Sequence, residues 1–215
     1  NLGTPAGDYS YYQLALVSGL QKNYDGKITL LNQLASKYPN SPYAVNALYE
    51  KGRSYVQSRN SNQAIATFRE LLNKYPESPV SRKAATEIGL LYYQNDDYNH
   101  AIEAYKYVIS KYPGSEEARL AMRDLKSIYV EANRVDEFAA LAAQMPDVIR
   151  FEPSEQDSLT YIAAEKVYMK GEISPARESF IRYLQSYPNG AFSLNAHYYL
   201  SLIEKEQKDE TAVLE

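Results

Sequence analysis

Apolar and small side chains recur at the period of an α-helix along most of this chain. The segment 45–56 shows the pattern well, because its apolar and small residues fall on one face of a helix. These residues are Val45, Leu48, Gly52, Tyr55 and Val56. A polar segment at 59–62 indicates a turn, and a second helical face follows in residues 64–72 before Pro76 ends it. The pattern therefore predicts two helices joined by a short turn.

Each predicted helix depends on its neighbours for stability. Ser41 followed by Pro42 is typical of an N-cap with proline at the first helical position, so the first helix starts there. A helix of about fourteen residues is only about 21 Å long. Because one such helix cannot bury its apolar stripe alone, the pairs must stack on one another to form a core.

The dipeptide Tyr-Pro marks the ends of successive units. It occurs at Tyr38-Pro39, Tyr75-Pro76, Tyr112-Pro113 and Tyr187-Pro188. The first three copies are 37 residues apart, and the last follows after 75 residues, which is two periods plus one residue. A fixed period of this length indicates a repeat protein, in which each unit is one helix pair.

On these residues the chain resembles the tetratricopeptide repeat family, whose units place small residues at positions 8 and 20, aromatic residues at positions 11 and 24, and proline at position 32. The unit from residue 45 carries Gly52, Tyr55, Ala64, Phe68 and Pro76 at these positions. The unit from residue 82 carries Gly89, Tyr92, Ala101, Tyr105 and Pro113. The unit from residue 157 matches less closely, with Ala164, Val167, Ala176, Phe180 and Pro188, and the unit from residue 8 is weaker still, with Ala15, Ser18, Lys27, Leu31 and Pro39.

The resemblance implies an all-α fold, a right-handed α-solenoid of antiparallel helix pairs with about five repeats and a terminal helix. We expect residues 1–7 to form a linker and residues 8–207 to form the solenoid. The expected units lie near 8–44, 45–81, 82–118, 119–156, 157–193 and 194–215, the last being incomplete. In this last unit a helix should begin near Ala191, and Lys208-Asp209 should form a turn. The repeats are expected to continue beyond Glu215.

The unit 119–156 departs from the pattern. Lys126 and Phe138 occupy positions where small residues belong, so the helix pair should widen or shift its register. Met145-Pro146 should end the second helix early and leave residues 147–153 as an irregular linker. Both a hinge and a merely degenerate repeat are compatible with this pattern.

Composition and charge argue against several classes of function. The chain has 23 basic and 27 acidic residues, whereas a nucleic-acid-binding protein normally has a basic excess. No apolar run is long enough to span a bilayer, so we expect no direct membrane insertion. Cysteine is absent, which excludes disulfides, thiolate nucleophiles and cysteine-ligated zinc.

The remaining chemistry also fails to suggest an enzyme. His100 and His197 are more than two repeats apart, and in a solenoid only neighbouring repeats touch. We expect His100 to be a solvated residue at a helix start and His197 to occupy a packing position. No serine nucleophile elbow or glycine-rich phosphate loop occurs. The sequence thus predicts no catalytic residue, no metal and no cofactor.

The resemblance also implies where a partner would bind. In the family, the first helix of each pair lines a concave groove, and tyrosine recurs at its fifth position here. The expected partner-binding residues are Tyr12, Tyr49, Arg53, Tyr93, Gln94, Arg123, Tyr161, Glu165 and Tyr168. Each tyrosine could instead pack between first helices with only its hydroxyl exposed. Some members of the family bind a C-terminal carboxylate with a lysine at position 5 and an asparagine at position 9. Neither residue type occurs at those positions in this chain.

Three functional hypotheses follow. The first is a non-enzymatic scaffold that binds a peptide or partner protein in the groove. The second is a structural spacer whose outer repeats self-associate, and the third is an accessory segment of a larger protein. The 37-residue units and the Tyr-Pro tails resemble bacterial envelope members of the family, among them the periplasmic Tol–Pal-associated protein, the outer-membrane assembly lipoprotein and large multi-repeat proteins. This resemblance implies a periplasmic or envelope-associated location, with the cytoplasm as the alternative, and it leaves the oligomeric state open.

Overall fold

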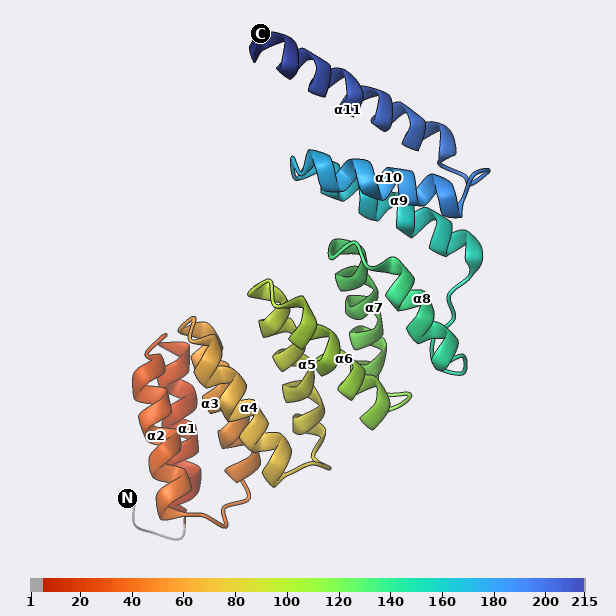
Figure 1. Ribbon diagram of the computed structural model, residues 1–215. Helices are drawn as coiled ribbons and strands as arrows, with labels where there is room; N and C mark the ends of the chain where they lie inside the picture. Colours follow the sequence, from red (N-terminus) through yellow and green to blue (C-terminus); the bar gives the residue numbers. More distant parts are fainter. Residues whose placement is uncertain (1–5, 215) are drawn as a thin grey trace. The chain divides into compact units, whose positions relative to one another are not determined.

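The computed structural model of the chain describes the backbone of residues 6–214 and the side chains of residues 6–206. Eleven helices follow one another in this part, and no strand occurs between residues 6 and 214, so the all-α prediction is confirmed (Figure 1). The helices are α1 Gly7–Leu20, α2 Tyr24–Lys37, α3 Ala44–Gln57, α4 Ser61–Lys74, α5 Pro79–Gln94, α6 Tyr98–Lys111, α7 Glu116–Glu131, α8 Val135–Gln144, α9 Pro153–Met169, α10 Ile173–Ser186 and α11 Ser193–Leu214.

The chain divides into two compact units, Asn1–Ala121 and Met122–Glu215, which we call unit 1 and unit 2. The division falls inside α7, within the repeat that departs from the family pattern. In unit 1, α1 packs on α2, α3 on α4 and α5 on α6, while α2 also contacts α3 and α4 contacts α5. Consecutive helices run antiparallel, as Figure 1 shows for α1 to α6.

Glycine lets the helices of a pair approach closely. A Cβ atom added to Gly52 would lie 2.4 Å from the Phe68 ring, and one added to Gly89 would lie 2.8 Å from the Tyr105 ring. Both rings are fully buried. The absence of a side chain at position 8 therefore provides the space that the aromatic residue at position 24 fills.

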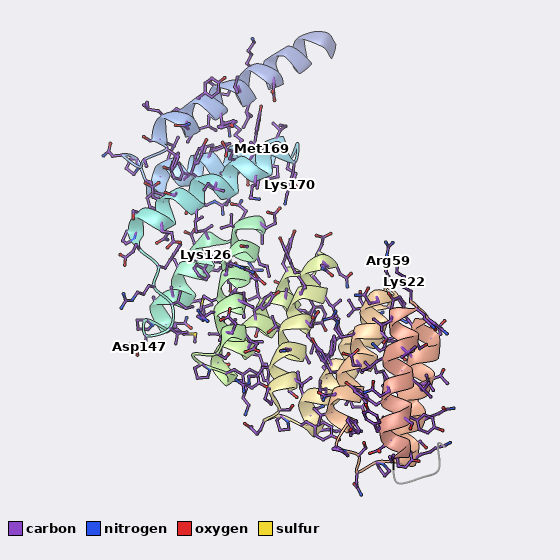
Figure 2. All side chains as sticks on the ribbon, turned by 180° about the vertical axis from the view of Figure 1, so that it is seen from behind. Lys22, Arg59, Lys126, Asp147, Met169 and Lys170 are labelled. Carbon is purple, nitrogen blue, oxygen red and sulfur yellow. The ribbon has the colours of Figure 1, made fainter. Side chains whose placement is uncertain are left out.

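The turns inside the pairs share one backbone geometry. Each contains a residue with left-handed φ directly before the N-cap of the second helix: Lys22, Arg59, Asp96, Asn133 or Gly171. Lys22 and Arg59 lie at corresponding ends of their pairs (Figure 2). The N-cap amide then donates back to a carbonyl five residues earlier, as Asn60 does to Tyr55 at 2.8 Å. This is the hydrogen bond of a Schellman motif, and it satisfies a carbonyl at the end of the first helix.

The Tyr-Pro dipeptides end the second helices. Tyr38, Tyr75, Tyr112 and Tyr187 are the C-caps of α2, α4, α6 and α10, with ψ between 53° and 65°. Each still donates its amide to the carbonyl four residues earlier, at 2.8–3.0 Å. The proline that follows disfavours the helical conformation for the tyrosine, so the chain leaves the helix at this point.

Unit 2 has a core of its own, centred on Phe180, Tyr183, Ala196 and Ile203. Asp157, in the first part of α9, accepts two hydrogen bonds from other parts of this unit. The Tyr183 hydroxyl donates to Asp157 Oδ1 at 2.6 Å, and the Ala191 amide donates to Oδ2 at 2.8 Å. One carboxylate therefore connects α9, α10 and the loop before α11.

The atypical repeat fills its core with large side chains. Helix α8 ends at Gln144, as Met145-Pro146 predicts, but Pro153 belongs to α9 rather than to the linker. Phe138 is 1% exposed and packs edge-on against Phe151 from the linker, with ring centroids 4.9 Å apart. Lys126 extends over both rings, and its Nζ reaches Glu155 Oε1 at 2.6 Å. The linker is thus part of the core.

Two expectations about the chain ends need correction. The predicted turn at Lys208-Asp209 is wrong, because α11 continues through these residues to Leu214. This helix begins at Ser193, two residues later than expected. Gly7 is the first residue of α1 and not part of a linker. The rest of the predicted linker, apart from Ala6, lies outside the described residues.

We expect alkaline pH to destabilise both units between about pH 10 and pH 12. Burial raises the pKa of Tyr112 from 10.0 to about 12, with a further contribution from Tyr107. Burial and the hydrogen bond to Asp157 raise the pKa of Tyr183 to about 12 as well. Because the fold favours the neutral phenol, this contribution is complete below pH 10 and is lost as the pH rises through 12. Urea unfolding at stepped pH, followed by circular dichroism, measures the loss.

The variant Tyr183→Phe is the control for this prediction, because lysines also lose their charge in the same range. It keeps the ring in place and removes the phenol, so the loss of stability above pH 10 should be smaller than in the parent chain. An equal loss in both proteins would show that Tyr183 is not its source.

Candidate protein-binding surface

One polar group on the first helices of unit 1 is the Tyr49–Arg53–Glu87 cluster. Tyr49 and Arg53 lie one turn apart on α3, and Arg53 Nη1 is 3.8 Å from Glu87 Oε1 on α5. A hydrogen bond with the Tyr49 hydroxyl raises the pKa of Arg53, while burial is the main cause that raises the pKa of Tyr49. The Arg53 side chain is 44% exposed, so its guanidinium is accessible to a partner.

A second polar group lies beside this cluster. Lys27, although buried, forms an ion pair with the half-buried Glu50 of α3. Tyr12 of α1 stacks on Tyr43 with ring centroids 5.2 Å apart. Burial, followed by the charge of Glu50, raises the pKa of Tyr12. Tyr12 is half-buried, so one part of its ring packs and another remains accessible.

Tyr93 and Gln94 lie at the end of α5. Tyr93 is half-buried and contacts Tyr98 at a centroid distance of 6.0 Å, while Gln94 is exposed. Glu87 and Gln94 are seven residues apart and therefore share one side of α5. The predicted residues of unit 1 thus lie on α1, α3 and α5, the first helices of their pairs.

In unit 2, two of the predicted residues, Tyr161 and Glu165, bind each other. Tyr161 is only 4% exposed, and its ring stacks on Phe192 with centroids 4.6 Å apart. Its hydroxyl donates to Glu165 Oε1 at 2.9 Å, and burial together with this carboxylate raises its pKa. The Tyr199 hydroxyl donates to the same oxygen at 3.0 Å. The packing alternative therefore describes Tyr161 in this structure.

Tyr168 and Arg123 remain partly or largely accessible. The Tyr168 hydroxyl donates to Glu206 at 3.1 Å, and the ring meets Tyr199 edge-on with centroids 5.0 Å apart. The exposed Arg123 donates through Nε and Nη2 to its neighbour Asp124, at 3.1 and 3.0 Å. Through Tyr199, Tyr168 adjoins the hydrogen-bond network of Tyr161 and Glu165.

Two acidic residues of this surface, Glu50 and Glu87, are not among the residues predicted from the sequence. Glu50 and Glu87 both occupy position 6 of their units, directly after Tyr49 and Thr86 at position 5. The recurrence of glutamate at position 6 could have indicated these residues from the sequence. In the first of the two units, Arg53 follows Glu50 by three residues, which places both on one side of the helix.

The two histidines belong to different units, His100 to unit 1 and His197 to unit 2. His100 is exposed at the start of α6, where its amide and its Nδ1 both contact Asp97, and its ring stacks on Tyr92. The expectation that His197 packs in the core is wrong, because its side chain is exposed. Within the part of the chain that the structure describes, no three His, Asp or Glu side chains are grouped so that they could hold a metal ion. Over the same residues, no helix has both the length and the apolar character needed to cross a bilayer.

Comparison with known families identifies the architecture. Residues 45–206 match the family YfiO, which is described as outer membrane lipoprotein. The chain belongs to this family. The YfiO match begins at α3 and includes Tyr49, Arg53 and Glu87, whereas Tyr12 precedes it. Residues 9–41 match a tetratricopeptide repeat family, which confirms the resemblance drawn from the repeat.

The solved structure of the MamA protein supports the same fold for this YfiO-family chain. The MamA protein is 17% identical, with 86% of this chain and 94% of that chain covered and a TM-score of 0.53. The TPR2AB domain of yeast Sti1, solved in a complex with pHSP90, is 14% identical, with 98% and 88% covered and a TM-score of 0.49. No curated protein matches the chain.

Proposed function

We propose that this chain is a non-enzymatic scaffold that binds a segment of a partner protein on the first-helix side of its repeats. The tetratricopeptide fold is one of protein–protein interaction, and the observation that carries the proposal is the Tyr49–Arg53–Glu87 cluster. It offers an exposed guanidinium, a half-buried aromatic ring and a carboxylate on two consecutive first helices. Tyrosine and arginine are the side chains most often found at binding hot spots.

The chemistry of the cluster favours a polar segment with both kinds of charge. Arg53 can donate to a carboxylate or a main-chain carbonyl of the partner, and Glu50 and Glu87 can accept from amides or cations. Because Arg53 already contacts Tyr49 and Glu87, little side-chain freedom is lost when a partner binds. An extended peptide or a helix laid across α3 and α5 fits this arrangement.

The family points to the bacterial envelope as the place of action. Its description as outer membrane lipoprotein supports a periplasmic or envelope-associated location. The partner would then be another protein of the envelope, and the chain would hold it in an assembly without changing it chemically.

The double variant Tyr49→Phe/Arg53→Gln tests the proposal. It keeps the ring that packs 5.8 Å from Phe68 and removes the hydroxyl and the charge, so thermal stability should change little. Capture of the partner should fall by about tenfold, the effect of losing one hot spot. A photo-crosslinking amino acid at position 93, in cells that produce the protein, identifies the partner and measures capture with and without the double variant.

The matched control is Glu70→Gln/Lys74→Gln, which removes an exposed ion pair from α4, a second helix. It should leave cross-linking unchanged. If the variant at Tyr49 and Arg53 captures as much partner as this control, the binding surface lies elsewhere. If the only cross-linked protein is a second copy of this chain, the structural-spacer alternative holds instead.

A further inference from the structure

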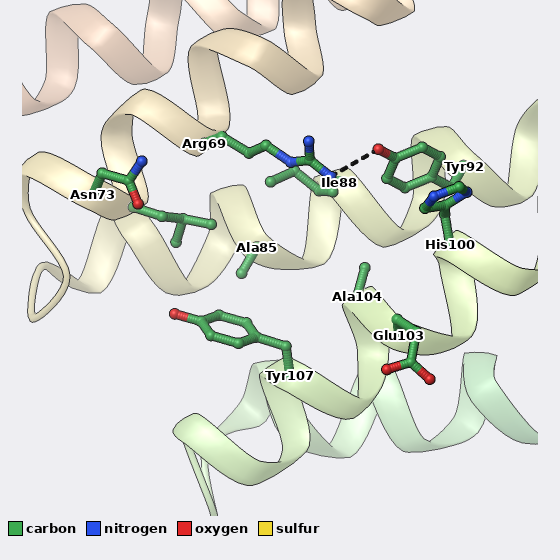
Figure 3. Close-up of a pocket in the computed structure, with 10 residues that line it drawn as sticks. Arg69, Asn73, Ala85, Ile88, Tyr92, His100, Glu103, Ala104 and Tyr107 are labelled. Atoms are coloured by element: carbon green, nitrogen blue, oxygen red, sulfur yellow. Dashed lines mark hydrogen bonds between the residues drawn. The ribbon is translucent and has the colours of Figure 1, made fainter.

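A cavity of about 400 Å³ lies among α4, α5 and α6, away from the Tyr49–Arg53–Glu87 cluster (Figure 3). We call it the α4–α6 cavity. On α5, Ala85, Ile88 and Tyr92 line it at a spacing of three to four residues. Glu87 and Gln94 lie on a different side of the same helix, because each residue advances about 100° around the axis. The cavity is therefore separate from the first-helix side.

The floor of the cavity is apolar and its rim is polar. Leu72, Ala85, Ile88 and Ala104 contribute aliphatic surface. The other lining residues are all at least partly accessible: Arg69, Asn73, Tyr92, His100, Glu103 and Tyr107. This volume lies at the lower end of the range for ligand sites, about 300–1,000 Å³, and it suits one or two large apolar side chains.

The rim carries a positioned cation that lacks a carboxylate. Arg69 Nη2 donates to the Tyr92 hydroxyl at 2.9 Å, a contact that Figure 3 shows as a dashed line. Tyr92 is fixed in turn by His100, whose ring stacks on it with centroids 5.0 Å apart. Among the residues that the structure describes, Arg69 has no acidic partner, and the nearby Glu103 is already paired with Lys106 at 3.0 Å.

From this geometry we propose that the α4–α6 cavity is a second binding site, for a peptide segment that carries a leucine or phenylalanine next to an aspartate or glutamate. The apolar side chain fills the space above Ile88 and Ala104, and the carboxylate pairs with Arg69. An acidic peptide is favoured over a neutral or basic one, because the positive charge of Arg69 on the rim is not paired with a carboxylate of the described residues. The rim is formed largely by α4 and α6, the second helices of two successive pairs, and a peptide segment of the partner can lie between them.

Fluorescence anisotropy with a synthetic peptide tests this proposal. The probe is a labelled decapeptide with Asp-Leu-Phe at its centre and Gly and Ser elsewhere. The full chain should bind it saturably. A peptide with Asn-Leu-Phe should bind up to about fivefold more weakly, which is the effect of one exposed ion pair. A peptide with Asp-Ser-Ser should not bind.

Two variants locate the site. Arg69→Gln should weaken the binding of the Asp-Leu-Phe peptide by the same factor. In this variant the Asn-Leu-Phe peptide should bind as tightly as the Asp-Leu-Phe peptide, because both changes remove the same contact. Ala104→Trp fills the cavity and should reduce binding by at least about tenfold, the loss expected for blocking a binding pocket. The controls on α4 are Lys74→Gln, which removes a charge outside the cavity, and Ala66→Trp, which adds the same bulk at an exposed position.

Four outcomes would overturn the proposal. The peptide could fail to bind saturably, or its binding could survive both Arg69→Gln and Ala104→Trp. The controls could also weaken binding as much as the cavity variants do. Tyr49→Phe/Arg53→Gln should leave this binding intact, so the result is independent of the function proposed for the first-helix side. Loss of peptide binding in that variant alone would place the peptide on α3 and overturn the assignment to the cavity.

Discussion

Replacing Gly52 with leucine is expected to destabilise unit 1 by about 3 kcal/mol or more, at the upper end of the cost of overpacking a core. Even a Cβ atom at this position would lie 2.4 Å from the Phe68 ring, which is fully buried and cannot swing out to solvent. The two helices α3 and α4 must therefore separate to admit a larger side chain. Thermal and urea unfolding measure the effect.

A matched control and a second-site test make this prediction specific. Ala66→Leu adds a side chain of the same kind at an exposed position of α4 and should change stability by less than about 0.5 kcal/mol. Gly52→Ala should cost less when Phe68 is replaced by leucine, because the two residues compete for one space. An unchanged melting temperature in Gly52→Leu would mean that α3 and α4 are not in contact at this point.

Replacing Phe138 with alanine is expected to destabilise unit 2 by about 3–5 kcal/mol, although alanine is the residue that the family pattern favours there. Phe138 is 1% exposed and lies between Tyr129, Phe151 and the Lys126 ammonium group. Removal of the ring leaves a cavity that the short helix α8 and the linker cannot fill by a small movement. The midpoint of urea unfolding is the measure.

The control for Phe138→Ala is Met169→Ala at the end of α9. Met169 is 70% exposed, so its truncation removes few contacts and should have little effect (Figure 2). Should Phe138→Ala match this control, or stabilise the protein, the repeat would be a regular one in which Phe138 is a misfit. The structure instead shows a repeat built around a large side chain.

The sequence was sufficient for most of the helices and turns because each signal there is local, although α3 begins at Ala44 and not at the predicted Pro42. Pro76 ends α4 and Gly52 admits Phe68, and both effects depend on residues of a single helix pair. The same holds for α8, whose early end follows directly from Met145-Pro146. Helix ends and close helix contacts of this kind can be predicted from the positions of proline and glycine in the sequence.

The candidate sites were less predictable because they depend on contacts between pairs. Tyr161 is buried since Phe192, from the loop before α11, stacks on its ring, and no unit position indicates that contact. The α4–α6 cavity requires Arg69 of one pair to reach Tyr92 of the next. Lys208-Asp209 has the composition of a turn, yet the helix continues through it, because lysine is a good helix former and aspartate is tolerated.

The Tyr-Pro endings also affect the unfolded chain. In each, the proline ring fixes one backbone angle and restricts the tyrosine before it, whether or not the protein is folded. The connectors between pairs therefore sample fewer conformations in the denatured ensemble than a flexible loop of equal length would. Folding orders these junctions at a lower entropic cost, so the repeat boundaries contribute to stability without adding any contact to the core.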